Sequence, residues 1–305
     1  MTSSTTTATL RILSHNLLFL PEWRNSLGQS KRARLMAGAD YLRDHDIVFF
    51  QEAWDPNATK IVKEALQKQY PFQTPVVGHS YGGWNATSGR FSKLAAIDAG
   101  VFIASKWPIV FQQQHVFENA SGSERLKNRG FVYAKILYNN SKHIHLINTH
   151  LQSDGAFMSD FAECAQMRVL QLQEIRDFIA SSGIPHEEPV IIGGDLNVVK
   201  ASWEYEALVE ENLVVMEPTQ VLGHPYSWDC RENSFIAHYS WAARMVLDYL
   251  LVAKAHSSRV RSLMVETMLV RPEESFQVSK WFKEPWTIQD YSDHYPIKAT
   301  ITVDL

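Results

Sequence analysis

The chain has 305 residues, 45% of them hydrophobic, and its 33 acidic and 29 basic residues give a formal net charge of −4. This composition is that of a globular protein large enough to bury a substantial core, and the charge gives no overall attraction for nucleic acid. No run approaches the roughly 20 apolar residues of a membrane-spanning helix, and the start MTSSTTTATL lacks the blocks of a signal peptide.

Strands and helices alternate in the first part of the chain. Apolar runs at 10–14 and 46–51 end abruptly in polar residues, as buried strands do. Residues 31–43 repeat apolar side chains at helical spacing, and a second helix over 57–69 is followed by Pro71. Together these segments predict a strand, a helix, a strand and a helix in chain order.

The rest of the chain predicts further strands and one long helix. The helix covers residues 161–180 and ends near Gly183 and Pro185. The strands are expected at 101–104, 108–116, 131–138, 143–149, 189–193, 245–252 and 296–303. This distribution predicts an α/β protein with two packed sheets and helices outside them.

No repeat or long linker divides the chain, so residues 1–305 are expected to form a single domain, with residues 1–9 as a disordered Ser/Thr-rich segment. The two cysteines, Cys164 and Cys230, lack the spacing of a zinc site. They are expected to form either one disulfide or two buried thiols.

The most informative pattern is the set of polar residues beside the apolar strands. Acids, amides and imidazoles lie at or near strand ends in RILSHN, IVFFQE, IHLINTH, VIIGGDLN and MVLDY, and in the SDH that precedes the last strand. Each alone is typical of a cap or a turn. Together they form a set that loop chemistry does not require. They are Asn16, Glu52, His150, Asp195, Asn197, Asp248, Asp293 and His294.

Such a set suits metal-assisted phosphate chemistry. Carboxylate and amide oxygens are the ligands that magnesium prefers, and Glu52 with Asn16 and the GGDLN segment could supply them. His150 and His294 could exchange a proton or donate hydrogen bonds to a developing oxyanion. No GxGxxG, GxxxxGK[ST] or GxSxG motif occurs, so neither a nucleotide fold nor a serine hydrolase is indicated.

Six motifs in one order resemble the endonuclease/exonuclease/phosphatase superfamily. They are SHN at 14–16, QE at 51–52, NTH at 148–150, GGDLN at 193–197, LDY at 247–249 and SDH at 292–294. The resemblance implies the four-layer α/β/β/α sandwich of that superfamily, the DNase I-like fold, and metal-dependent cleavage of phosphate esters.

A narrower resemblance is to the bacterial secreted neutral sphingomyelinases. It rests on SKWPI at 105–109, KNRGFVYAKI at 127–136, NTHLQ at 148–152, IGGDLNV at 192–198 and YSDHYP at 291–296. This resemblance implies hydrolysis of sphingomyelin to ceramide and phosphocholine, dependence on Mg²⁺ with Mn²⁺ or Co²⁺ as substitutes, and secretion.

The same resemblance implies a role for each site residue. Glu52 is expected to be the principal magnesium ligand, with Asn16 close to the metal and the reacting phosphate. His294 is expected to be the general base, oriented by Asp248. Asp195 is expected to position the water or a second metal, and Asp293 to contribute to that second position. Asn197 and His150 are expected to bind phosphate oxygens, and the metal-binding set also includes Asn197 and His294.

Residues 275–287, with Trp281 and Phe282 between lysines, resemble the membrane-binding hairpin of the same enzymes. Sphingomyelin in outer membrane leaflets is the expected partner, with peripheral membrane contact, no nucleic acid and no obligate protein partner. An accessory edge metal site, for which DPN at 55–57 and AAID at 95–98 are the candidate segments, is doubtful because Ile97 stands where an acid is expected.

Several alternatives stay open. A nuclease of the same superfamily and a lipid-binding module without turnover compete with the phosphodiesterase. Lys127 and Arg129 are interpreted as part of a solvated turn, although they could form a nucleic-acid patch. Trp54 and Trp84 could line a choline pocket, but ordinary packing is the favoured interpretation.

Overall fold

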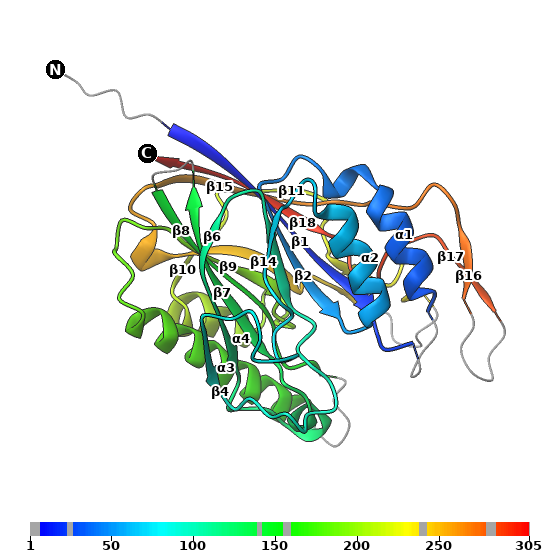
Figure 1. Cartoon of the computed structure of the whole chain (residues 1–305), viewed down its shortest axis with the longest axis horizontal. Helices are drawn as coiled ribbons and strands as arrows, with labels where there is room; N and C mark the ends of the chain where they lie inside the picture. Colours follow the sequence, from blue (N-terminus) through cyan, green and yellow to red (C-terminus); the bar gives the residue numbers. More distant parts are fainter. Residues whose placement is uncertain are drawn as a thin grey trace.

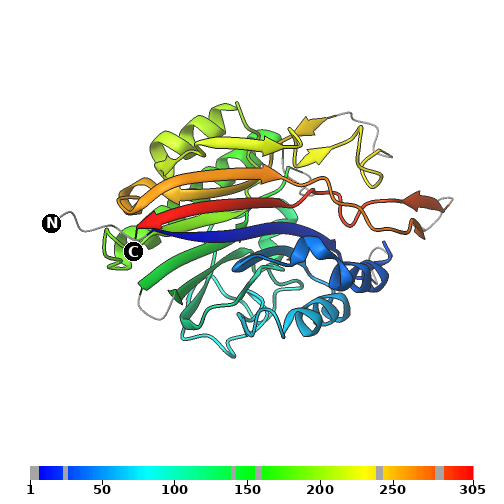
Figure 2. The same ribbon diagram turned by 90° about the horizontal axis from the view of Figure 1, so that it is seen from above.

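A computed structural model of the chain describes residues 7–22, 27–138, 142–154, 160–237, 243–278 and 285–304. Most of its strands belong to two large sheets that lie face to face, with helices on the outer faces (Figures 1 and 2). Trp281 and Phe282, the predicted membrane-binding residues, lie outside the described residues.

The first sheet has seven strands. In spatial order they are β11 (Gln220–Gly223), β15 (Val260–Thr267), β18 (Ile297–Asp304), β1 (Thr7–Phe19), β2 (Ile47–Ala53), β5 (Phe102–Ser105) and β3 (Phe72–Gln73). Parallel pairing of β1 with β2 and antiparallel pairing of β1 with β18 make this sheet mixed.

The second sheet also has seven strands. They are β10 (Val215–Met216), β14 (Asp248–Ala253), β9 (Val190–Asp195), β8 (Lys142–His150), β7 (Gly130–Tyr138), β6 (Ile109–Val116) and β4 (Ala86–Gly89). Strands β8 and β9 run parallel, and β14 is antiparallel to β9. Two small pairs complete the described strands, β12 (Trp228–Asp229) with β13 (Arg244–Met245), and β16 (Phe276–Val278) with β17 (Trp286–Ile288).

The helices cover the outer faces of the sheets. They are α1 (Gln29–Gly38), η1 (Asp40–Leu42), α2 (Pro56–Leu66), η2 (Gly122–Leu126), α3 (Phe161–Ser181), α4 (Trp203–Glu206), η3 (Ala207–Asn212) and η4 (Lys254–His256). Asp55 caps α2 by accepting a hydrogen bond from the Ala58 amide at 2.9 Å. Pro56 at the first helical position fixes a suitable backbone angle.

Three hydrophobic clusters account for the layers. Side chains from both sheets, such as Ile12, Phe49, Leu146 and Ile191, form the cluster between the sheets. A second cluster packs α3 on the outer face of the second sheet, and a third packs α1 and α2 on the outer face of the first. The predicted α/β class and the arrangement of two packed sheets between helices are therefore confirmed.

The structure corrects several predicted boundaries. Strand β1 begins at Thr7, so residues 7–9 are ordered by pairing with β18 rather than disordered. The predicted strand 245–252 is divided, because Met245 pairs with Trp228 in a separate small sheet and β14 begins only at Asp248. Strand β15, which we did not predict, pairs with both β11 and β18.

Neither cysteine forms a disulfide. Cys164 is buried on α3, and Cys230 is half-buried next to β12. Of the two alternatives left open by the sequence, the unpaired state is the one observed, although only Cys164 is fully buried.

No helix among the described residues has the length and apolar character needed to cross a bilayer.

Candidate functional site

The strand directions gather the predicted polar residues at one edge of the sandwich. The parallel strands β1 and β2 carry Asn16 and Glu52 toward their C-terminal ends, and β8 and β9 end at His150 and Asp195. Strand β14 is antiparallel to β9, so its first residue, Asp248, lies directly opposite Asp195. The antiparallel β18 likewise places the SDH segment that precedes it at this edge.

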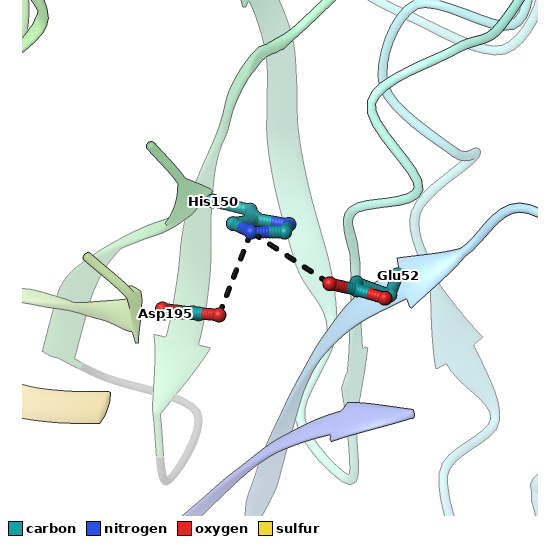
Figure 3. Close-up of side chains that lie close together, drawn as sticks. All are labelled: Glu52, His150 and Asp195. Carbon is teal, nitrogen blue, oxygen red and sulfur yellow. Dashed lines mark ion pairs between the residues drawn. The ribbon is translucent and has the colours of Figure 1, made fainter. Parts of the chain in front are cut away.

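Asp195 lies at the centre of the site. It is buried, and its Oδ2 accepts a hydrogen bond from Asn16 Nδ2 at 2.9 Å. The same oxygen lies 3.5 Å from His150 Nε2, which is 3.9 Å from Glu52 Oε1 (Figure 3). Residues from β1, β2, β8 and β9 therefore meet around one small volume, as the sequence predicted for a metal and phosphate site.

His294 lies on the other side of Asp195. Its Nδ1 is 2.8 Å from Asp248 Oδ2, and its Nε2 is 3.7 Å from Asp195 Oδ2. With a carboxylate at Nδ1, the proton is held there and Nε2 is left able to accept another proton. The structure thus pairs His294 with Asp248 in the way that a general base and its orienting carboxylate require.

The remaining predicted residues flank this centre. Asn197 donates its backbone N–H to Asp195 Oδ1 at 3.0 Å and its side-chain amide to the carbonyl of Leu151 at 3.1 Å. Asp293 accepts a hydrogen bond from the Ser292 hydroxyl at 3.2 Å, and its charge acts on both Glu52 and His294.

The backbone at the site is unusual. Glu52 and Asn197 have φ values of 55° and 52°, in the left-handed region that side chains other than glycine seldom adopt. Gly194, directly before Asp195, has a φ of 124°, and an added Cβ there would lie 2.0 Å from the carbonyl oxygen of Thr149. The glycine pair of GGDLN is therefore required by close strand packing beside Asp195.

Two carboxyl groups of the site have pKa values above their ordinary range, because their ionised forms are disfavoured there. Burial, together with the negative charges of Asp293 and Asp195, raises the pKa of Glu52 above its ordinary value. Burial and the charge of Asp248 likewise raise the pKa of Asp195. Each carboxylate would be stabilised by a positive charge placed between them.

The pKa values of the two site histidines, His150 and His294, are shifted in opposite directions. Burial and the positive charge of Arg129 lower the pKa of His150 well below its ordinary value, so its ring is neutral. Burial also acts to lower the pKa of His294, but the charges of Asp248 and Asp195 outweigh it and raise that pKa well above the ordinary range. The histidines are thus chemically distinct despite sharing Asp195.

The donor set fits a hard divalent cation. Glu52, His150 and Asp195 each place one ligand atom within 4.8 Å of the other two, and so do Asp195, Asp248 and His294. Glu52 Oε2 is buried and has no hydrogen-bond partner among the described residues. An orphaned carboxylate oxygen beside a second buried carboxylate is a suitable place for magnesium.

A buried amide pair behind the site was missed as a functional feature, although both residues lie in the motifs QE and NTH. Gln51 donates to Asn148 Oδ1 at 2.7 Å, and Asn148 donates to the carbonyls of Phe50 and Phe102 at 3.0 and 2.8 Å. Both amides are fully buried and join β8 to the first sheet. They hold Glu52, which follows Gln51, and His150, two residues after Asn148, in register across the two sheets.

His15 is a second residue that we did not predict. Its Nε2 lies 3.2 Å from the carbonyl oxygen of His294, and its Nδ1 lies 3.0 Å from the hydroxyl of Tyr41. Burial lowers the pKa of His15 to about 3, so the ring stays neutral. The motif SHN contained the signal, because this histidine precedes Asn16.

Arg32 of α1 is another residue near the site that we did not predict. It is fully buried, and its guanidinium donates to the carbonyl oxygens of Leu17, Leu18, Leu27 and Tyr291. These carbonyls belong to the segment after Asn16 and to the segment before Asp293. Burial lowers its pKa to about 10, which leaves the group charged at neutral pH. One planar cation thus ties together two of the segments that build the site.

Replacing Arg32 with lysine is expected to destabilise the protein by about 3 kcal/mol, because an ammonium group cannot reach all four carbonyls and leaves some of them buried and unpaired. The folded fraction is also expected to lose turnover, because the segment before Asp293 loses its anchor. Urea unfolding and initial rates measure the two effects. Arg34→Lys, on the exposed face of the same helix, is the control, and equal stability of the two variants would contradict this role.

The structure corrects the interpretation of Lys127 and Arg129 as a solvated turn. Arg129 is buried, pairs with Glu124 and donates to the carbonyl of Leu151 at 2.9 Å. Lys127 pairs with the same glutamate at 2.6 Å. Both cations lie over the ring of Trp54, which is itself packed against His150. They are therefore structural cations beside the site.

The structure also shows the surroundings of Trp54 and Trp84 and of the acids at the accessory edge site. Trp54 is buried and donates its indole N–H to the carbonyl of Asp98 at 3.0 Å, as ordinary packing predicts. Trp84 packs against the cluster between the sheets. Asp98 pairs with His79 at 3.1 Å, and Asp55 caps α2. The acids of the doubtful edge site thus already have partners.

Comparison with known proteins supports this geometry. A family model described as Endonuclease/Exonuclease/phosphatase family matches residues 14–294. The chain is 39% identical over 293 residues to a sphingomyelinase C of Listeria ivanovii, covering 94% of this chain and 84% of the relative.

Two solved structures agree closely in fold. A sphingomyelinase C from Streptomyces griseocarneus superposes with a TM-score of 0.90 at 35% identity, covering 96% of this chain and 99% of that one. A Staphylococcus aureus beta toxin variant with bound magnesium ions superposes with a TM-score of 0.89 at 37% identity, covering 96% of this chain and 99% of that one.

Proposed function

The chain belongs to the endonuclease/exonuclease/phosphatase family, and from this membership we propose that it is a magnesium-dependent phosphodiesterase that hydrolyses sphingomyelin to ceramide and phosphocholine. Membership of this family supports metal-dependent cleavage of a phosphate ester as the type of reaction. The relatives named sphingomyelinase C narrow the substrate, because the strand-end residues alone fit a nuclease equally well.

One observation supports the reaction most directly. Asp195 lies between Glu52, the proposed cation ligand, with His150 beside it, and a base with its partner, His294 with Asp248. A phosphate ester bound over Asp195 can therefore contact a cation on one side and a water molecule held by His294 on the other.

The proposed step is in-line attack by water. His294 removes a proton from the water at Nε2, while Asp248 holds the ring and stabilises its positive charge. The new bond joins the water oxygen to phosphorus, and the bond from phosphorus to the ceramide oxygen breaks. The leaving oxygen takes its proton from solvent. Phosphocholine and ceramide are the products.

Other residues of the chain hold the reacting groups. Neutral His150 can donate from Nε2 to a phosphoryl oxygen, and the amides of Asn16 and Asn197 can do the same. Glu52 would hold magnesium, with Asp195 and Asp293 as further ligands, and Mn²⁺ or Co²⁺ are the expected substitutes for magnesium. When bound, magnesium polarises the phosphoryl oxygen and offsets charge on the leaving oxygen and on the carboxylates that raise the pKa of His294.

The lipid substrate implies contact with a membrane surface. The hairpin formed by β16 and β17 projects from the body at the end of the molecule where β1 and β2 end (Figure 1). We propose that Trp281 and Phe282, which lie between these two strands in the sequence, enter the lipid headgroup region, and that the protein acts outside the cell. A toxin among its relatives is consistent with an extracellular location.

A substrate panel tests the function. Vesicles of sphingomyelin, duplex DNA and DNA with an abasic site are each incubated with the protein, with magnesium and with a chelator. We expect release of phosphocholine from the vesicles only when magnesium is present. Cleavage of either DNA without release of phosphocholine would assign the protein to the nucleases of the family. Vesicle binding without any product would indicate a lipid-binding module.

A further inference from the structure

The four most exposed large hydrophobic residues of the described chain lie in segments that follow or precede strands of the second sheet. Leu94, Phe161, Leu126 and Trp203 have exposed fractions of 94%, 74%, 66% and 61%, above every other large hydrophobic residue that is described. Single exposed apolar residues need no explanation, but four extreme cases beside one sheet do. We call these four residues the rim.

Two rim residues lie in loops that meet beside β7. Leu126 ends η2, four residues before β7 begins at Gly130, and Phe131 of β7 lies opposite Thr149, the neighbour of His150. The loop that carries Leu94 is joined to this segment, because the Ala96 amide donates to the carbonyl of Leu126 at 3.0 Å. Both residues therefore project from the end of the second sheet that holds the site.

The other two rim residues begin helices that follow site strands. Phe161 is the first residue of α3, the next helix after β8, and Trp203 is the first residue of α4, the next helix after β9. Arg168, on α3, joins this helix to α4 and to the segment that follows His150. It donates to the carbonyl of Gln152 at 3.0 Å and forms two hydrogen bonds with Glu204 at 2.6 and 2.8 Å.

The hairpin formed by β16 and β17 lies on the other side of the site. It follows β15 and precedes β18, strands of the first sheet, whereas η2, α3 and α4 follow or precede strands of the second. In Figure 1 the start of α3 and the hairpin flank the end of the molecule where β1 and β2 end. The rim is therefore a surface distinct from the hairpin.

We propose that the rim is a second membrane-contact surface, which rests on a bilayer rich in phosphocholine headgroups while the hairpin contacts it on the opposite side of the site. This inference rests on the proposed function, because a lipid whose headgroup reaches Asp195 keeps its acyl chains in the bilayer and brings the surrounding surface against it. The exposed basic residues Arg90, Lys93, Arg125 and Lys200 lie on the same loops and can contact lipid phosphates.

The test replaces all four rim residues with serine. Flotation with vesicles of equal parts sphingomyelin and phosphatidylcholine, in a chelator that prevents turnover, is expected to show binding weakened by about 10-fold to 100-fold. Hydrolysis of a short-chain sphingomyelin below its micelle concentration is expected to stay unchanged, since the rim is outside the site. The matched control changes two exposed valines outside the rim segments to serine, Val110 near the start of β6 and Val214 just before β10, and is expected to bind normally.

Unchanged flotation of the rim variant would overturn the proposal. An equal loss on vesicles and on the soluble lipid would also overturn it, because the rim would then act through the fold of the site. Failure of the proposed function is a separate result. In that case the unsubstituted protein releases no phosphocholine from either substrate, while flotation still compares the rim variant with its control.

Discussion

His294→Ala is expected to lower kcat by at least about 1,000-fold, because the variant lacks the group that takes the proton from the attacking water. KM is expected to change little, since His294 contacts the water rather than the bound lipid. Initial rates of phosphocholine release from sphingomyelin, with magnesium in excess, measure the effect.

The loss must be separated from unfolding, because the substitution leaves the buried Asp248 carboxylate without its partner. Asp248→Asn keeps the volume of the side chain but cannot hold the imidazole in the same protonation state, and we expect a smaller loss of kcat. His79→Ala, at an exposed histidine paired with Asp98, is the control. An unchanged rate in folded His294→Ala would remove this residue as the base.

Glu52→Gln is expected to weaken magnesium binding by at least about 100-fold and to abolish most turnover. Glutamine keeps the size of the side chain and removes the charge that the neighbouring carboxylates already oppose. Calorimetric titration with magnesium measures binding without reference to activity.

The same substitution makes an opposite prediction for the metal-free protein. Burial and the charge of Asp293 raise the pKa of Glu52, so its ionised form is disfavoured in the folded state when no cation is present. We therefore expect metal-free Glu52→Gln to be at least as stable as the unsubstituted protein in thermal unfolding. We expect magnesium to raise the Tm of the unsubstituted protein but not that of Glu52→Gln. Glu266→Gln, at a partly exposed residue that pairs with Lys298 and is not among the site residues, is the control, and a full rise of Tm in Glu52→Gln would contradict the assignment.

Several features of the site were readable from the sequence because each depends on local chemistry. Apolar strands that end in an acid, amide or imidazole identified Glu52, His150 and Asp195. The family resemblance supplied roles that strand ends alone left open. The supporting residues were missed, because nothing in the neighbours of Arg32 shows that four carbonyl groups surround it.

The elements of the fold likewise divide into those that local sequence pattern predicted and those that it could not predict. Periodicity predicted α3 nearly to its last residue, since a long amphipathic helix is defined by its own pattern. It failed at residues 245–252, where a single predicted strand covers Met245 of a small sheet and Asp248–Val252 of a large one. Which partner a strand takes depends on distant segments, so local pattern could not find this break.

The sequence by itself determined the kinds of chemical group that this protein has and the strand ends that carry them. Only the tertiary structure decided their pairing: that Asp195 is shared between His150 and His294, that Asp248 faces the imidazole, and that Arg129 is buried and Lys127 half-buried against Glu124. The reason is physical. A side chain's type and local backbone preference are properties of neighbouring residues, whereas its distance, burial and electric field are set by strands that lie far apart in the chain.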